Sequence, residues 1–522
     1  MKHLFLFIIF SIGIFYNSNL YAQYGVVDST FGVNGIVQTQ IFTSGAAVCR
    51  NLIPLPDGKI VATGSAFTGA NTGFALVRYN NDGTIDNTFG TQGITTTIIN
   101  NSITGVSYCS VRQPDGKIIL GGDYYSGSGY SFAVARYDTN GILDPSFGIG
   151  GISTYAVGTP GSIDNFGNAI ALQSNGKIIL AGTSIGVSTD FTVLRFNTDG
   201  SLDNTFGTQG VTVTPIGSGS DNCYSMTVQN DDKIILAGDI NVGTAYVFTV
   251  ARYDANGILD PSFGVAGIRS HFLGSNDDDY GYSVKMQQPG NKILVGGATN
   301  FNGSYDFVIL RFDSTGTFDT SFGNGGIALT NFGSAGNIDY GRTMSLQPDG
   351  KILLAGRTFV IGSAFGIVRY DSNGNIDNSF GNQGTAYIQI ASAQHNCYSV
   401  ITDINNKILI AGQAPTLPDH FILVRYTSGL TTSISEQNVN SENNFVVYPN
   451  PSSGEITIRL NEEGIKNESV EMKIIDVTGK ELYSKKIETM EERIHLSSIS
   501  PGIYILQLLN GKGISSQKLI IN

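Results

Sequence analysis

The chain has 522 residues, of which only 14% are charged, while glycine is abundant at 66 residues and tryptophan is absent. The formal net charge of −12 argues against nucleic acid as a partner and disfavours anionic membranes, because both need clustered Lys and Arg. The length allows one closed repeat domain plus an accessory domain, and weakly charged, glycine-rich sequence suits many short strands joined by tight turns.

Residues 1–22 have the pattern of a secretory signal peptide. Lys2 and His3 precede an apolar run from Leu4 to Tyr16, and Leu20-Tyr21-Ala22 supplies a small-residue cleavage site. No later run reaches the ~18 apolar residues of a transmembrane helix. We therefore expect an exported mature chain without a transmembrane segment.

One sequence unit recurs seven times between Asp28 and Tyr426. A period of nearly 60 residues with strand-like content indicates a repeat architecture. Its lysine recurs at Lys59, Lys117, Lys177, Lys233, Lys292, Lys351 and Lys407, and its phenylalanine at Phe31, Phe89, Phe147, Phe206, Phe263, Phe322 and Phe380.

The second copy shows the expected strands most clearly. They are Tyr108–Gln113, Lys117–Gly122, Phe132–Tyr137 and a last strand running from Ile142 to Tyr155, joined by Asp-Gly and Asn-Gly turns. Four strands per copy, seven copies and no helical segment predict an all-β fold, a seven-bladed β-propeller. A β-solenoid is the alternative, although solenoid repeats are usually shorter and need end caps.

The ends of the repeat region predict how the ring closes. The region opens on the last part of a repeat and finishes on a third strand, so the N-terminal strand would complete the seventh blade and remove an exposed edge. Each hairpin places an arginine opposite an aspartate, such as Arg136 and Asp144. In the seventh blade Arg425 has no local partner, and we predict that it contacts Asp28. Pairs that recur in every copy are structural rather than catalytic.

The Gln-Pro-Asp-Gly-Lys-Ile segment at 113–118 and the Asp-x-x-Phe-Gly segment at 144–148 resemble delta-60 repeat proteins. The resemblance covers about 400 residues. It implies a propeller-like fold and carries no common reaction; the order of strands in each blade is similar to that of NHL-type propellers.

Four cysteines lie in the repeat region, at Cys49, Cys109, Cys223 and Cys397. Three of them stand ten residues before a repeat lysine, where other copies have Ser or Gly, so we interpret this position as one that needs a small packed residue. Export also permits a Cys49–Cys397 disulfide at the ring junction, if the geometry allows it.

The connections opposite the Asp-Gly turns differ most between copies and are the expected functional face. Just before the innermost strands stand Asp164, Asp221, Asp279, Asp339 and His395. These residues should encircle the mouth of the central channel, where Asp221, Asp279 and Asp339 could hold Ca²⁺, or the ring could grip a polar ligand. The alternative is local, since an aspartate before a strand often bonds its own backbone.

Tyrosines crowd the same connections, among them Tyr124 and Tyr125. Surrounded by Ser, Gly and Asn, they resemble adaptable recognition loops. They could equally cap the hydrophobic ends of the blades.

The composition changes after the repeats. Residues 428–441 read as a polar linker, and 442–522 contain short alternating runs typical of a small immunoglobulin-like β-sandwich. Tyr448–Gly454, Asp476–Lys480 and Leu496–Tyr504 resemble the type IX secretion sorting domain. That resemblance implies passage through the outer-membrane translocon, removal of the domain, and release or attachment to the cell surface.

We therefore expect four segments: a signal peptide (1–22), a propeller (23–427), a linker (428–441) and a sorting domain (442–522). The expected function is a secreted or surface-attached recognition or adhesion module for a glycan or a protein. A polysaccharide-acting lyase or hydrolase using Asp339 and His395 is the enzymatic alternative, and a structural surface-layer component is another. No motif of a hydrolase elbow, zinc protease or phosphate loop is present, so no catalytic residue is assigned.

Overall fold

The structure is a computed structural model. It describes residues 25–42, 45–158, 163–186, 188–217, 219–274, 277–333, 338–360, 362–390, 394–414 and 420–429, and in the C-terminal part 445–448, 450, 452, 454–460, 470–475, 481–487, 489–496, 499, 502–510 and 513–521. The expected signal peptide and most of the expected linker lie outside these residues. The chain divides into two compact units, Met1–Thr432 and Ser433–Asn522.

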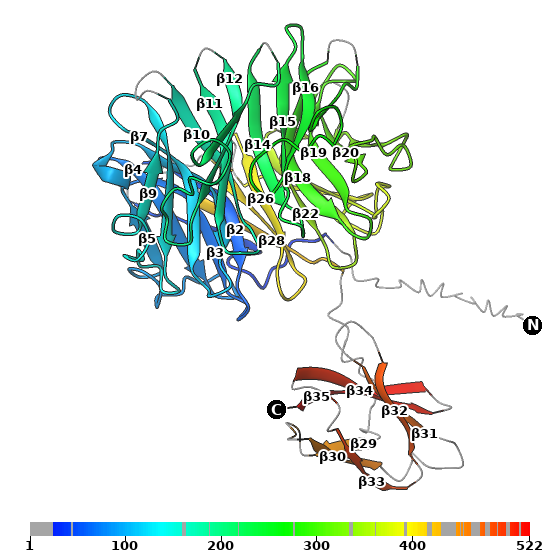
Figure 1. Cartoon of the computed structure of the whole chain (residues 1–522). Helices are drawn as coiled ribbons and strands as arrows, with labels where there is room; N and C mark the ends of the chain where they lie inside the picture. The colour runs from blue at the N-terminus through cyan, green and yellow to red at the C-terminus, as the bar shows by residue number, and fades with distance from the viewer. Residues whose placement is uncertain are drawn as a thin grey trace, which may run out of the picture. The chain divides into compact units, whose positions relative to one another are not determined.

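The first unit consists of seven antiparallel sheets of four strands within its described residues, plus one short 3-10 turn at Ile99–Asn101 (Figure 1). The first strands of the sheets are β2 (Ala47–Pro54), β6 (Gly105–Arg112), β10 (Asp164–Leu172), β14 (Asp221–Val228), β18 (Asp279–Gln287), β22 (Tyr340–Leu346) and β26 (Asn396–Thr402). The second strands are β3 (Ile60–Phe67), β7 (Ile118–Tyr125), β11 (Ile178–Ile185), β15 (Ile234–Asn241), β19 (Lys292–Thr299), β23 (Ile352–Thr358) and β27 (Ile408–Ala414).

The third strands are β4 (Thr72–Tyr79), β8 (Tyr130–Tyr137), β12 (Thr189–Phe196), β16 (Tyr246–Tyr253), β20 (Asp306–Phe312), β24 (Ala364–Tyr370) and β28 (His420–Tyr426). The outer strands are β5 (Ile94–Thr97), β9 (Ile152–Tyr155), β13 (Val211–Thr214), β17 (Ile268–His271), β21 (Ile327–Thr330) and β25 (Thr385–Ile388). In the last sheet the outer strand is β1 (Ile36–Thr39), which pairs with β28.

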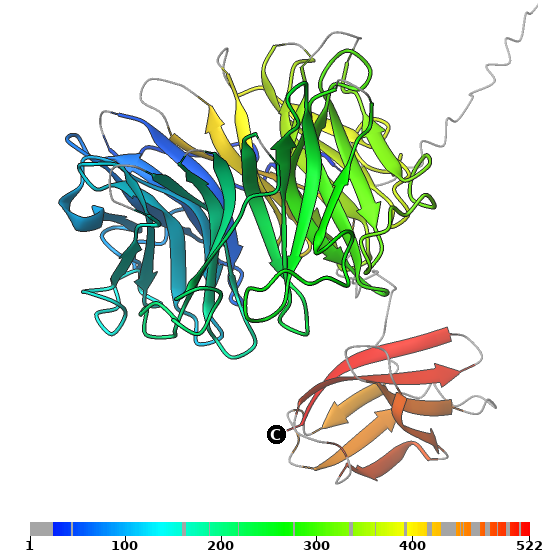
Figure 2. The same cartoon turned by 45° about the horizontal axis from the view of Figure 1, so that its top comes forward.

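The sheets follow one another around the unit (Figure 2). Each first strand contacts the first strand of the next sheet, and β26 contacts β2 in turn. The apolar side chains form clusters between neighbouring sheets rather than one central core, and one of these clusters joins Leu409 and Phe421 of the last sheet to Leu52 and Val77 of the first. Second and third strands are therefore buried on both faces, which explains their nearly continuous runs of Ile, Leu, Val and Ala.

The expected fourth strand is wrong in its first part. Residues before Ile152 form turns instead: Phe147 N–H donates to the Asp144 carbonyl (3.1 Å), and Gly151 N–H donates to the Phe147 carbonyl (2.8 Å). These turns place the fully buried Phe147 ring in the cluster between the second and third sheets. Burial of this ring, rather than strand pairing, accounts for the Asp-x-x-Phe-Gly segment.

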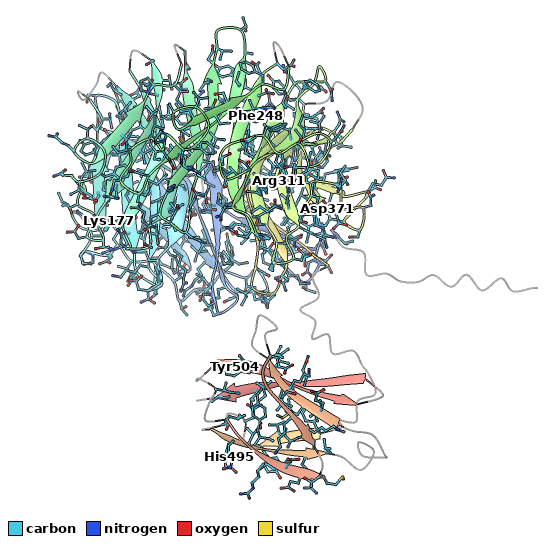
Figure 3. The ribbon with its side chains drawn as sticks, turned by 45° about the vertical axis from the view of Figure 1, so that its right-hand side comes forward. Lys177, Phe248, Arg311, Asp371, His495 and Tyr504 are labelled. Carbon is cyan, nitrogen blue, oxygen red and sulfur yellow. The ribbon has the colours of Figure 1, made fainter. Side chains whose placement is uncertain are left out.

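A Lys–Arg–Asp triad links strands within every sheet. In the third sheet Lys177 Nζ and Arg195 Nε both lie 2.6 Å from Asp203 Oδ2, and Figure 3 labels Lys177 and, from the fifth sheet, Arg311. Each arginine stacks on the phenylalanine of its own repeat, with Cζ 4.5–4.8 Å from the ring centroid. Each also donates to a turn carbonyl of the next sheet.

The last triad joins the two ends of the repeat region. Arg425 Nε lies 3.0 Å from Asp28 Oδ2, so the contact predicted from the sequence is present. Arg425 also donates to the Asn81 carbonyl of the first sheet. The N-terminal segment thus completes the seventh sheet and ties it to the first.

The second unit contains two sheets around one apolar cluster that includes Ile456, Met472, Ile474, Leu506 and Leu519. The first sheet has the order β29 (Phe445–Tyr448), β30 (Glu455–Leu460), β33 (Glu491–His495); the second has the order β32 (Glu481–Ile487), β31 (Val470–Ile475), β34 (Gly502–Asn510), β35 (Gly513–Ile521). Among the described residues of the chain, no helix is long and apolar enough to cross a membrane.

Candidate functional site

The aspartates expected at the channel mouth lie at the starts of the first strands, but they bond nearby backbone. Asp221 is fully buried, and its Oδ2 accepts hydrogen bonds from Ile216 N–H (2.8 Å) and Gly217 N–H (3.1 Å). Asp279 Oδ2 accepts one from Leu273 N–H (3.3 Å). These bonds are the local loop contacts that the sequence left open as the alternative.

The other members of this ring also accept hydrogen bonds, some of them from groups distant in the sequence. Asp164 Oδ1 accepts a bond from Tyr130 N–H (2.9 Å). Asp339 accepts bonds from Thr358 Oγ1 (2.6 Å) and from the N–H of Phe359 (3.0 Å). His395 is buried, and its Nε2 accepts a bond from Ile390 N–H (3.0 Å). The imidazole and the Asp339 carboxylate are therefore both engaged in fixing loops.

The residues do not fit a calcium site. Ca²⁺ takes six to eight oxygen ligands, yet no group of three or more His, Cys, Asp or Glu side chains that could hold a metal occurs among the described residues. Burial raises the pKa of Asp279 to about 6 and that of Asp221 above its usual range.

Tyr124 and Tyr125 end strand β7. Tyr124 packs against the apolar cluster between the first two sheets, and the Tyr125 ring meets the Tyr130 ring edge-on at 5.5 Å. Tyr130 in turn packs against Phe166 at 5.2 Å. These two tyrosines thus cover the end of a sheet, and they remain candidates for contact with a ligand at that face.

A different ring of side chains emerges at the centre of the unit. Every first strand carries a β-bulge at its middle, shown by a shift in its register with the second strand. The bulged residues, which we call the bulge ring, are Arg50, Tyr108, Asn168, Tyr224, Tyr282, Arg342 and Tyr398. All seven are partly exposed, whereas the residue before each is buried or nearly so. A bulge re-aims a side chain, and here it turns seven side chains into the central cavity.

Most of the bulge ring forms one continuous aromatic and cationic arc. Arg50 Cζ lies 4.0 Å from the Tyr398 ring centroid and 5.2 Å from that of Tyr108. Arg342 Cζ lies 5.1 Å from the Tyr282 centroid and 5.7 Å from that of Tyr398. The arc continues to Tyr224, which lies 5.0 Å from Tyr282. Such cation–π contacts each contribute about 0.5–2 kcal/mol.

A second tier of ionisable groups stands beside the bulge ring. Arg357 Cζ lies 5.1 Å from the Tyr340 centroid, and Lys285, an exposed residue of β18, lines the cavity. On the other side Asp123 and Asp239 are fully buried. Burial raises the pKa of Asp239 to about 7 and that of Asp123 well above its usual range.

The bulge ring encloses a cavity of about 310 Å³. Residues from all seven first strands line it, so it lies where the sheets converge. A larger groove of about 710 Å³ runs across the outer strands near Tyr155 and Val213. Its lining contains no charged side chain. The central cavity therefore offers the more specific chemistry.

The bulge ring was not predicted from the sequence. A signal was available, because the position after each small residue (such as Cys49, Ser107 or Cys223) carries a large polar or aromatic side chain in every copy. The small residues themselves are explained by packing. All four cysteines are buried and unpaired, and burial raises the pKa of the Cys49 thiol, with the neighbouring Cys397 adding to the effect. The suggested Cys49–Cys397 disulfide is thus not formed.

Comparison with protein families assigns both units. Six segments match the family described as a domain of unknown function (DUF5122) beta-propeller: residues 55–89, 113–147, 173–206, 229–263, 288–322 and 347–380. Residues 446–522 match the secretion system C-terminal sorting domain. The chain carries DUF5122 β-propeller repeats and a type IX sorting domain. The DUF5122 propeller thereby confirms the resemblance to delta-60 repeats for six copies. The seventh copy, which is split between the two ends of the repeat region, is not matched.

Solved structures similar to the DUF5122 propeller have low sequence identity. A protein of unknown function from Dyadobacter fermentans is 13% identical with a TM-score of 0.40, covering 76% of this chain and 100% of its own. The polysaccharide lyase Uly1 is 11% identical with a TM-score of 0.42, covering 76% and 92%. Sqt1 of Chaetomium thermophilum is 12% identical with a TM-score of 0.38, covering 74% and 97%. Comparison with curated proteins finds no match.

Proposed function

We propose that this protein is a seven-bladed propeller, closed by its N-terminal strand, that recognises a ligand in its central cavity after export. The type IX sorting domain implies handling by the secretion system and delivery to the cell surface or the medium. The cavity carries the proposal, because seven bulged side chains from rigid strands converge there. Only Tyr224 and Tyr282 are the same residue type in neighbouring copies, whereas a simple structural repeat would place the same residue in every copy.

Several observations support seven blades and closure. The described residues contain seven four-stranded sheets in the first unit, their first strands contact one another in an unbroken cycle, and β1 pairs with β28. We further propose that the second unit is an immunoglobulin-like sandwich, because its two sheets share one apolar cluster, and that residues 442–522 engage the translocon.

Recognition or adhesion is favoured over the two alternatives. The enzymatic alternative relied on Asp339 and His395, and both side chains hold loop backbone instead. A surface-layer component would need a self-association surface, whereas the polar, aromatic lining lies inside the cavity. Rigid strands that present tyrosine and arginine suit binding, because little side-chain freedom is lost.

The test is binding of the purified full chain, without its signal peptide, to an array of microbial and plant glycans. We expect capture of at least one glycan class, lost in Tyr398→Ala and kept in Tyr387→Ala, a matched change on the outer strand β25. Capture should be equal with calcium and with chelator. An array that stays blank, or capture that Tyr398→Ala leaves intact, would contradict glycan recognition in the cavity.

A further inference from the structure

Three guanidinium groups at or beside the cavity have aromatic neighbours but no carboxylate partner. Among the described residues, no carboxylate forms an ion pair with Arg50, Arg342 or Arg357, and the Nε atom of each is buried without a hydrogen-bond partner. Tyrosine rings cover their faces instead. An arginine has five N–H donors in a planar fork, so the edges of these groups are available to a ligand.

This arrangement differs from that of every arginine in the repeat triads. Those seven lie within 3.0 Å of an aspartate oxygen. A guanidinium that is partly withdrawn from water without an anion is costly to the folded chain. The arginines of the repeat triads are thus neutralised by an aspartate, whereas Arg50, Arg342 and Arg357 are not.

The charges in and around the cavity are unevenly distributed. Arg342 and Arg357 come from the sixth sheet, Arg50 from the first, and Lys285 from the fifth. The acids Asp123 and Asp239 come from the second and fourth sheets, where Asp239 Oδ1 accepts a bond from Asn222 Nδ2 (2.9 Å). The side chains that line the cavity itself include three cations, Arg50, Arg342 and Lys285, and no acid, in a chain whose formal net charge is −12.

We propose that the central cavity binds an acidic saccharide, with the carboxylate or sulfate of the sugar against Arg50 and Arg342 and its ring against the tyrosines of the bulge ring. Charge-assisted bonds from guanidinium groups suit both anions. The hydroxyls and amides of Ser110, Asn168 and Ser225 also line the cavity and match the hydroxyls of a sugar. The volume lies at the small end of ligand sites, so one or two sugar units are bound. The inference rests on the proposed recognition function and narrows its ligand.

The experiment is calorimetric titration of the full chain with four probes: a galacturonate tetramer, a sulfated galactan tetramer, an uncharged galactan tetramer and inorganic sulfate. Both acidic tetramers carry anionic groups on sugar rings, and a comparison of their affinities distinguishes a site for carboxylate from a site for sulfate. We expect at least one to bind about tenfold or more tightly than the uncharged tetramer, since a bond between charged groups contributes at least this factor. Its affinity should fall with added salt.

Variants test the residues. Arg50→Gln and Arg342→Gln should each weaken binding of the acidic tetramer about tenfold or more, and Arg342→Lys should weaken it less. Arg269→Gln, which removes one charge from the outer strand β17, should have no effect. If a glutamine variant fails to fold, the fall in the affinity of the unaltered chain with added salt still tests the anion site.

Four results would overturn the inference, and each has a different consequence for the proposed recognition function. Equal binding of the charged and uncharged tetramers would keep recognition but remove the anion site. Inorganic sulfate bound as tightly as a tetramer would reduce the site to a simple ion site. Binding that survives both glutamine variants would move the site elsewhere. Binding of none of the four probes, together with a blank glycan array, would remove the recognition function as well.

Discussion

Two sets of arginines in this chain, those of the repeat triads and those at the cavity, differ in their partners. Arg136 pairs with Asp144 at 2.9 Å and stacks on Phe147, which fixes the outer part of its sheet. Arg50 stacks on Tyr398 at 4.0 Å and has no acid in a salt bridge. The neighbouring Asp123 is buried, and its raised pKa leaves it a weaker counter-charge. At the residue scale, these differences support the proposal that the cavity binds an anionic ligand.

Asp239 gives a prediction at the same scale. An aspartate in an unfolded chain ionises near pH 4, but burial raises the pKa of Asp239 in the folded chain to about 7. The folded state therefore loses stability as the pH rises from about 4 through 7, and keeps it below pH 4. Asp239→Asn should be more stable than the unaltered chain at pH 8, by about 1–3 kcal/mol, and similar to it at pH 4.

Urea unfolding at the two pH values measures this difference. Asp231→Asn is the control, because this neighbour is largely exposed, and it should change stability little at either pH. A stabilisation by Asp239→Asn that is the same at pH 4 and pH 8 would show that ionisation is not its cause.

At the scale of the element, the turns between third and outer strands couple neighbouring sheets. Gly141 has φ of +79°, and a Cβ atom built there would lie 2.4 Å from the Phe89 ring of the preceding sheet. The turn glycine of one repeat is therefore packed on the phenylalanine of another. This contact explains why both residues recur with the same period.

Gly141→Ala should lower the free energy of unfolding by about 2–4 kcal/mol, combining backbone strain with overpacking. Gly127→Ala is a matched control, because Gly127 also has a positive φ of +95° but a Cβ there would meet nothing within 4 Å. It should cost about 1–2 kcal/mol from backbone strain alone. Equal losses in the two variants would mean that packing between sheets contributes nothing at this turn.

The sequence predicts the second and third strands of each sheet, because their apolar runs and the Asp-Gly turns beside them are local features. The predicted outer strand begins too early. The sequence does not distinguish strand pairing from a turn at this point, because it does not show which residues bury the Phe147 ring. The hydrogen bonds of Asp164, Asp221, Asp279 and Asp339 were not foreseeable, since the bonded N–H groups belong to segments without a shared pattern. The bulges were missed because an alternating pattern does not reveal an extra residue.

At the scale of the whole molecule, the first and last parts of the repeat region share one sheet. Strand β1 pairs with β28, Asp28 completes the last triad, and Phe31 packs at Gly83 of the first sheet. This arrangement covers the edge of β28, which would otherwise be open to pairing with another chain. It also holds the seven first strands around one cavity, so that the side chains of the bulge ring come together there.

The most direct test of recognition in the central cavity uses the absence of tryptophan from the chain. Tyr224→Trp places a single indole in the bulge ring, and Tyr387→Trp places one on the outer strand β25. The acidic tetramer that binds in calorimetry is titrated into each variant while indole fluorescence is recorded. The account predicts a saturable change for Tyr224→Trp, at the affinity found by calorimetry, and none for Tyr387→Trp. Bound ligand that leaves the Tyr224→Trp signal unchanged, or shifts both signals alike, would contradict it.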